Sequence, residues 1–154
     1  MKRLNYSIDI NATAKTVFEM MLGTATYNQW ARAFGATSDF EGSWNKGEKI
    51  YFTSLDENGD KGGMVATIQE NIPNEFIAIR HLGMVHKGVE ITSGEAVEGW
   101  AGAEENYTFT EQNGVTTLKV EVDVKLEYVE EFDSVWPRAL ELLKEMCEAA
   151  ALKK

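Results

Sequence analysis

Apolar and polar residues alternate most regularly over residues 115–126, VTTLKVEVDVKL, and the same alternation runs through residues 4–10, LNYSIDI. Side chains on a β-strand point to opposite faces in turn, so this period of two predicts two strands, each with one buried face. In the later strand we expect an apolar inner face and a charged outer face, made respectively of Leu118, Val120, Val122 and Val124, and of Lys119, Glu121 and Asp123.

Five further strands are predicted between these two. Residues 38–71 indicate strand, turn, strand, turn and strand, with turns at NKG (45–47) and ENGDKGG (57–63). Residues 76–85, FIAIRHLGMV, are apolar on both faces and favour a central strand. Residues 102–111, GAEENYTFTE, form another strand, with Glu105, Tyr107 and Phe109 on one face.

Three segments show helical spacing. Residues 11–22 carry one apolar stripe behind a cap at Asn11 or Thr13, and residues 24–34 predict a second short helix. Residues 130–154 give the longest helical pattern. Because proline disrupts a helix interior, we expect Pro137 in the first turn of this last helix, capped by Asp133 or Ser134.

The order of these elements predicts a single α+β domain over residues 1–154. We expect a curved antiparallel sheet of about six to seven strands, wrapped on the long C-terminal helix, with two short helices after the first strand. The last helix has the only apolar stripe large enough to cover such a sheet.

Charge and composition exclude several classes of protein. The net charge of −10 argues against binding to nucleic acid or to an anionic membrane surface. Cys147 is the only cysteine, so no intramolecular disulfide forms, and a helical position favours a buried thiol. No signal peptide or apolar run of membrane-spanning length occurs. We therefore expect a soluble cytoplasmic protein, as a monomer or homodimer.

One long connection, residues 84–100, separates two of the predicted strands. It contains three glycines, and connections of this length are uncommon and often functional. Ser93 could cap one helical turn that turns Val97 and Trp100 inward. Two interpretations stay open: a solvated hairpin extension, or a partial lid whose Trp100 closes a cavity or packs on a second subunit.

Five patterns, taken in order, are similar to one known family. INATAKTVFEMM, Trp30, FEGSWNKGEKIYF, ENYTFTEQNGVTTLKV and WPRALELLKEM together resemble the START-like superfamily, SRPBCC proteins with the helix-grip (Bet v 1-like) fold. More narrowly, they resemble the branch named after the activator of heat shock protein 90 ATPase. The similarity spans nearly the whole chain.

This resemblance implies a cavity between the C-terminal helix and the sheet that holds a small hydrophobic or amphipathic ligand. It also implies two alternatives. One is a chaperone-accessory or stress-response protein that binds a chaperone, and the other is a polyketide-cyclase-like enzyme.

Candidate polar residues for such a cavity are His81 and Glu105, each in phase with apolar residues of its strand. His81 is either a hydrogen-bonded core histidine or a polar anchor, and Glu105 is either hydrated at a strand end or turned into the cavity. We expect no metal, cofactor or assigned catalytic residue. The remaining pocket candidates are apolar residues that an ordinary core would also use: Trp30, Phe34, Trp44, Phe52, Met64, Ile79, Trp100, Tyr107, Trp136, Leu140 and Leu143.

Overall fold

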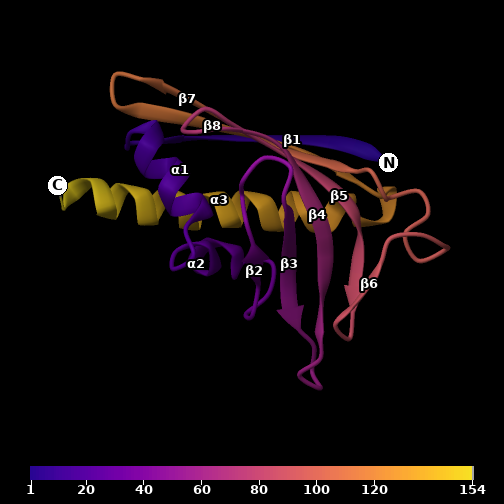
Figure 1. Ribbon diagram of the computed structural model, residues 1–154. Helices are drawn as coiled ribbons and strands as arrows, with labels where there is room; N and C mark the ends of the chain where they lie inside the picture. The colour runs from indigo at the N-terminus through magenta and orange to yellow at the C-terminus, as the bar shows by residue number, and fades with distance from the viewer. Residues whose placement is uncertain (154) are drawn as a thin grey trace.

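The computed structural model describes residues 1–153 (Figure 1). Its strands are β1 (Lys2–Ile10), β2 (Asp39–Gly42), β3 (Lys49–Leu55), β4 (Lys61–Ile72), β5 (Phe76–His86), β6 (Val89–Ile91), β7 (Glu104–Gln112) and β8 (Val115–Val124). Its helices are α1 (Ala14–Leu22), α2 (Tyr27–Ala31), the short 3₁₀ helix η1 (Leu126–Tyr128) and α3 (Val129–Leu152).

The strands form one antiparallel sheet in the order β1-β8-β7-β5-β4-β3-β2. The central position of β5 confirms the prediction made from its two apolar faces. The remaining strand, β6, lies outside this order: it pairs with β5 and forms a hairpin with it. Sequence reasoning missed it because VEI is short and mostly exposed.

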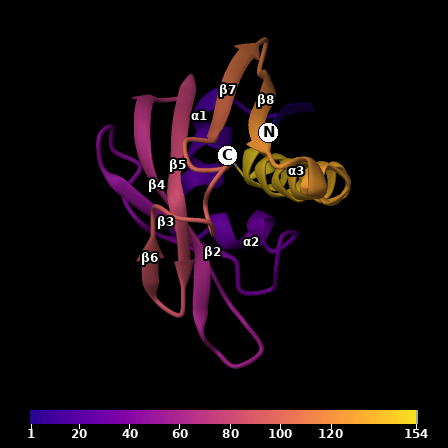
Figure 2. The same cartoon turned by 90° about the vertical axis from the view of Figure 1, so that its right-hand side faces the viewer.

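The sheet curves around α3, and α1 and α2 lie on the same side of it (Figures 1 and 2). The inner faces of β7 and β8 supply apolar side chains to the core, and the predicted alternation in β8 is confirmed. On α3, the buried residues recur at three- and four-residue spacing and face the sheet: Trp136, Ala139, Leu140, Leu143 and Cys147. This arrangement is the predicted helix-grip fold.

The start of α3 corrects one expectation. The helix begins at Val129, so Pro137 lies in its interior and not in its first turn. Pro137 is exposed, so water can reach the carbonyl of Asp133, which has lost its helical donor. Glu130 and Glu131 occupy the true first turn, where their charges suit the helix dipole.

Local contacts fix the two short helices over the sheet. Thr13 caps α1 by accepting a hydrogen bond from the Thr16 amide at 3.2 Å, which selects between the two predicted caps. Glu111 on β7 accepts a second bond, from the Ala14 amide at 2.7 Å. The Trp30 indole then donates to the Met21 carbonyl at 2.9 Å, which ties α2 to the end of α1.

Candidate functional site

A pocket of about 210 Å³ opens between α2, the strands β3 and β4, and the first half of α3. It exists because α2 and the segment after it hold the sheet and α3 apart at this end. Its lining comprises Tyr27, Trp30, Ala31, Phe34, Ser38, Asp39, Phe52, Thr53, Ser54, Gly63, Met64, Glu105, Phe132 and Trp136.

Aromatic rings form most of its wall. The rings of Tyr27 and Trp30 meet edge to face at 4.9 Å, and those of Phe34 and Trp136 do so at 5.0 Å. The Trp30 and Trp136 rings, 6.1 Å apart, join the two groups. Both tryptophans are almost fully buried, whereas Phe34 is 40% exposed at the rim. The wall is therefore apolar and well supported from behind.

Gly63 allows β4 to approach β3 closely at the edge of the pocket. Its φ is +138°, a value that side chains rarely adopt, and a Cβ there would overlap the carbonyl oxygen of Phe52 on β3. Only glycine lets β4 approach β3 this closely, where Phe52 and Met64 pair across the two strands. A residue with a side chain at position 63 would displace the wall that these two residues form.

Glu105 is a largely buried carboxylate of the lining. Its side chain is only 12% exposed, and the Tyr107 hydroxyl donates to its Oε2. His81 Nε2 lies 3.1 Å from its Oε1. Burial, and then the negative charge of Glu105, hold the pKa of Tyr107 well above its usual range, so its hydroxyl stays a donor. These partners offset the cost of burying the carboxylate.

His81 is held firmly behind Glu105. Its amide donates to the Ala103 carbonyl, and its own carbonyl accepts from the Gly102 amide, both at 2.8 Å. Its ring lies between those of Phe52, at 5.9 Å, and Trp100, at 5.3 Å. Nδ1 is buried and has no hydrogen-bond partner among the described residues. Since Nε2 faces a carboxylate, the chemistry assigns the proton of a neutral ring to Nε2.

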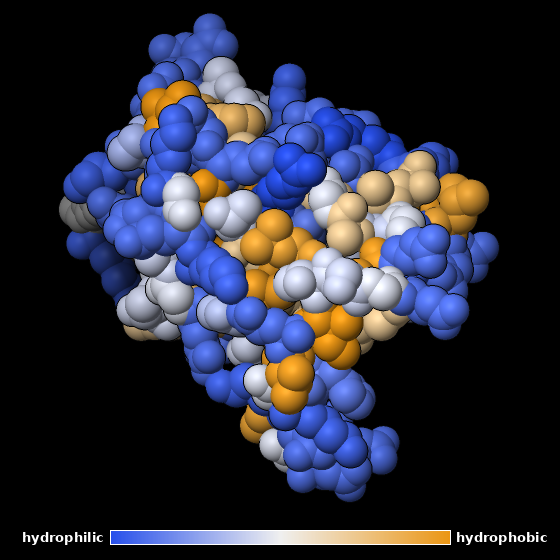
Figure 3. Space-filling model, turned by 45° about the vertical axis from the view of Figure 1, so that its right-hand side comes forward, coloured by the Kyte–Doolittle hydropathy of each residue, from blue (hydrophilic) through white to orange (hydrophobic). Residues whose placement is uncertain are grey.

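The long connection packs back onto this site. Its outer part, including β6, is mostly exposed, but Val97 is 2% exposed and Trp100 covers the His81 ring. Trp100 also lines an adjoining pocket of about 400 Å³. That pocket shares Phe34, Gly63, Met64 and Phe132 with the first and adds Met84 and Tyr128. Figure 3 shows hydrophobic side chains gathered in a band on this side of the molecule, with hydrophilic residues around it.

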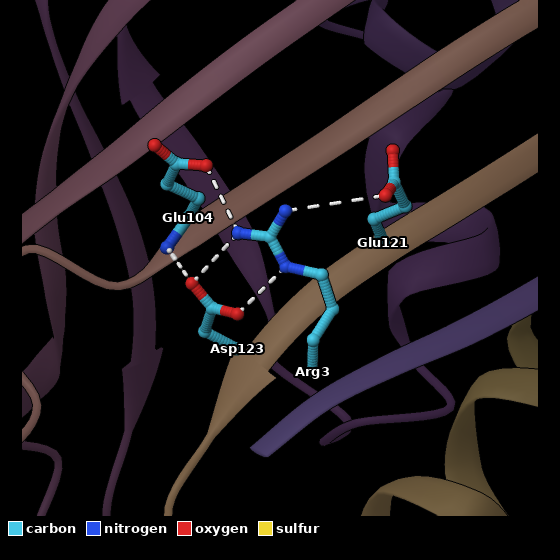
Figure 4. Close-up of polar contacts among 4 residues, drawn as sticks. All are labelled: Arg3, Glu104, Glu121 and Asp123. Carbon is cyan, nitrogen blue, oxygen red and sulfur yellow. Dashed lines mark hydrogen bonds and ion pairs between the residues drawn. The ribbon is translucent and has the colours of Figure 1, made fainter. Parts of the chain in front are cut away.

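The opposite face of the sheet carries an ion-pair network instead (Figure 4). Arg3 on β1 bonds Asp123 on β8 at 2.8 and 3.0 Å and Glu104 on β7 at 2.9 Å. Glu121 lies further away, at 4.0 Å. Neighbouring residues of β7 thus point to opposite faces, Glu104 into this network and Glu105 into the pocket. The network joins three strands and leaves no pocket carboxylate paired with Arg3.

The structure brings some of the predicted pocket residues together and leaves others apart. Trp30, Phe34, Phe52, Met64, Glu105 and Trp136 line the first pocket, and Trp100 lines the second. His81 and Tyr107 stand behind Glu105. Trp44 packs on the ring of Phe52 from outside. The core encloses Ile79, Leu140 and Leu143.

Sequence reasoning missed several lining residues, chiefly Tyr27, Asp39 and Phe132. Tyr27 and Phe132 fall within the two predicted helical segments 24–34 and 130–154, but which residues of a helix face a void depends on packing. Asp39 opens the short strand β2, and only the path of the chain from α2 into that strand turns it toward the pocket. In the sequence, the only sign of this was that Asp39 precedes the aromatic Phe40 in a predicted strand.

Residues 1–153 contain no group of three or more histidine, cysteine, aspartate or glutamate side chains arranged to hold a metal ion. No helix within those residues combines the length and the apolar character needed to cross a membrane.

Comparison with known proteins agrees with the motifs and the fold. The sequence model of the family described as "Activator of Hsp90 ATPase homolog 1-like protein" matches residues 11–148. The chain belongs to this family. The match runs from the residues just before α1 almost to the end of α3 and leaves out β1. No curated protein matches the chain significantly.

Solved structures similar to this activator-homolog chain share its fold at low sequence identity. The Aha1 dimer from Colwellia psychrerythraea is 18% identical, with a TM-score of 0.70 over 96% of this chain and 97% of that one. A protein from Nitrosomonas europaea is 11% identical, with a TM-score of 0.70 over 96% and 95%. CalU16 from Micromonospora echinospora is 15% identical, with a TM-score of 0.65 over 94% and 73%.

Proposed function

We propose that this protein binds a small apolar or amphipathic molecule in the pocket between α3 and the sheet. One observation carries the proposal: six aromatic rings and Met64 surround a pocket that has a hydrogen-bonded carboxylate at its base. Ligand sites in proteins are typically apolar concavities with a few placed polar groups. A plain core would fill this space, since interiors pack to the density of organic crystals.

The size of the space supports the same function. The two pockets, of about 210 and 400 Å³, share four lining residues. Together they fall in the range of about 300–1,000 Å³ that is usual for small-molecule sites. The apolar part of a ligand would lie along Phe34, Met64 and Phe132, and its polar part would reach Glu105.

Titration with Nile red, a neutral dye that fluoresces in apolar surroundings, tests the proposal. The wild-type protein should bind about one dye molecule, and Met64→Trp should abolish binding because the larger ring blocks the region that the two pockets share. Gln69→Trp places the same ring at an exposed position of the same strand and is the matched control. Equal dye binding by wild type and Met64→Trp would contradict the proposal.

The natural ligand is best sought in the protein purified from its own host. Native mass spectrometry should show a bound mass that is lost on denaturation and absent from Met64→Trp. An enzymatic role would use the same Glu105–His81 pair as acid and base. Conversion of the released compound by added wild-type protein, but not by Glu105→Gln, would reveal such an activity.

The family's name supports a second candidate, a chaperone-accessory role. The net charge of −10 would favour a basic surface on the partner. The test is the ATPase rate of the host's own Hsp90-type chaperone with and without this protein. A change in rate that weakens at high salt would support the role, and no binding at micromolar concentration would remove it.

A further inference from the structure

The charged residues that line the first pocket are all acidic. Asp39 and Glu105 contribute carboxyl groups, and among the described residues no lysine, arginine or histidine lines it. Lys125 lines only the adjoining pocket, where Glu131 accompanies it. A bound molecule therefore meets negative charge at one end and apolar surface elsewhere.

Among the described residues, no lysine or arginine forms an ion pair with Glu105. Its partners are the Tyr107 hydroxyl and the His81 ring, and both act as hydrogen-bond donors. A doubly protonated His81 would bury an Nδ1–H with no acceptor among the described residues, which is costly. A neutral His81 ring satisfies the contact with Glu105 and adds no positive charge to the pocket.

Asp39 adds a second carboxyl group to the lining of the pocket. Its Oδ1 accepts from the Phe40 amide at 2.9 Å, which holds the carboxylate in place and adds no charge. Burial is the main reason that the pKa of Tyr27 is raised, and the charges of both Glu105 and Asp39 raise it further. The Tyr27 hydroxyl thus lies within the field of both carboxylates.

The aromatic wall also favours a positively charged ligand. The face of an aromatic ring is negative, and tryptophan attracts cations most strongly. Trp30 and Trp136 line the pocket with four other rings, and burial removes the water that would screen them. Aromatic faces and carboxylates together favour a cation over a neutral group and disfavour an anion.

We infer that the ligand of this pocket carries an organic cation, a protonated amine or a quaternary ammonium, at the end that meets Glu105 and Asp39. The inference rests on the proposed function and names the ligand's chemical class. The apolar remainder of the ligand extends past Met64 toward Trp100 in the adjoining pocket.

Three probes with one common chain test this inference on the wild-type protein: octyltrimethylammonium, 1-octanol and octanoate. Isothermal titration calorimetry at low salt should give affinities in that order, with about tenfold between the cation and the alcohol. Glu105→Gln keeps a hydrogen-bonding side chain and removes the charge. It should weaken the cation about tenfold and change the affinity for 1-octanol less than about twofold.

Glu104→Gln is the matched control, because it makes the same change one residue earlier, on the opposite face of β7 (Figure 4). It should leave the affinity for all three probes unchanged. Asp39→Asn gives a second variant, with a smaller loss for the cation, should Glu105→Gln fold poorly.

The outcomes separate the two proposals. Equal binding of the three probes, or tightest binding of octanoate, would overturn the inference that the ligand is a cation. The proposal that the pocket binds a ligand would stand. Binding of none of the three, together with failure to bind Nile red, would overturn the pocket itself and the cation with it.

Discussion

Replacing Tyr107 with phenylalanine tests the polar base of the pocket with the least disturbance. Tyr107 is 1% exposed, and its hydroxyl donates to Glu105. Tyr107→Phe removes one oxygen and keeps the ring, which lies 6.1 Å from that of Trp136. Among the described residues, Glu105 then retains only His81 as a hydrogen-bond partner.

The expected cost follows from the charge and burial of Glu105. A hydrogen bond to a charged group contributes about 1.5–3 kcal/mol to stability. The Glu105 side chain is 12% exposed and borders the pocket, so water replaces part of the lost bond. We therefore expect a loss of about 1.5–2 kcal/mol, a fall in melting temperature of roughly 5 °C for a domain of this size.

Urea unfolding followed by circular dichroism measures this cost. Tyr27→Phe is the control, since Tyr27 is also buried and its hydroxyl has no hydrogen bond to any described residue. It should cost less than about 0.5 kcal/mol. Combining Tyr107→Phe with Glu105→Gln should reveal a coupling energy of about 1–2 kcal/mol.

Two results would refute this reasoning. One is a loss for Tyr107→Phe no larger than that for Tyr27→Phe. The other is strict additivity of Tyr107→Phe and Glu105→Gln. Either would mean that the Tyr107–Glu105 contact contributes nothing to the folded state, and the pocket would then have no fixed carboxylate.

Three further predictions concern the surroundings of the pocket. Hydrogen bonds from Arg3 lower the pKa of Asp123, so this pair stabilises the fold above the ordinary aspartate range and loses its effect as pH falls through the lower folded value. Asp123→Asn should cost about 1 kcal/mol at pH 7, and the difference from wild type in urea titrations should close below about pH 4. Equal gaps at pH 7 and pH 3 would contradict this. Trp100→Ala uncovers His81 and should speed Nile red dissociation about tenfold in stopped-flow displacement, whereas an unchanged rate would rule out a covering role. Burial raises the pKa of the Cys147 thiol to about 12, so Ellman's reagent should react with it at pH 8 only as fast as the protein opens. Rapid stoichiometric labelling of the native protein would disprove that burial.

The alternation in β1 and β8 was predictable because each of these strands has one face toward water. In β8 the inner residues are Leu118, Val120, Val122 and Val124, and this alternation alone fixes their orientation. His81 and Glu105 could be placed on the inner face by the same counting. Their direct contact could not, because it depends on the register between β5 and β7, in which Ile79 pairs with Glu105.

Other features depend on contacts that no local pattern encodes. Pro137 misled the prediction of where α3 begins, because the rule against proline inside helices takes no account of an exposed site where water satisfies the freed carbonyl. The connection before β7 carries no strong periodicity, so the burial of Val97 and the packing of Trp100 on His81 follow only from the folded chain. The position of Asp39 in the pocket likewise follows only from the folded chain.

The central claim is that a small molecule occupies the space between α3 and the sheet. The six methionines allow a direct measurement by NMR with ¹³C-labelled methyl groups. Met64 lines both pockets and Met84 the second, whereas Met21 lies in the core and Met146 packs at its edge near the far end of α3. With octyltrimethylammonium bound, the account predicts intermolecular NOEs to the Met64 and Met84 methyls and none to Met21 or Met146. NOEs to Met146 without any to Met64, or none at saturating probe, would contradict it.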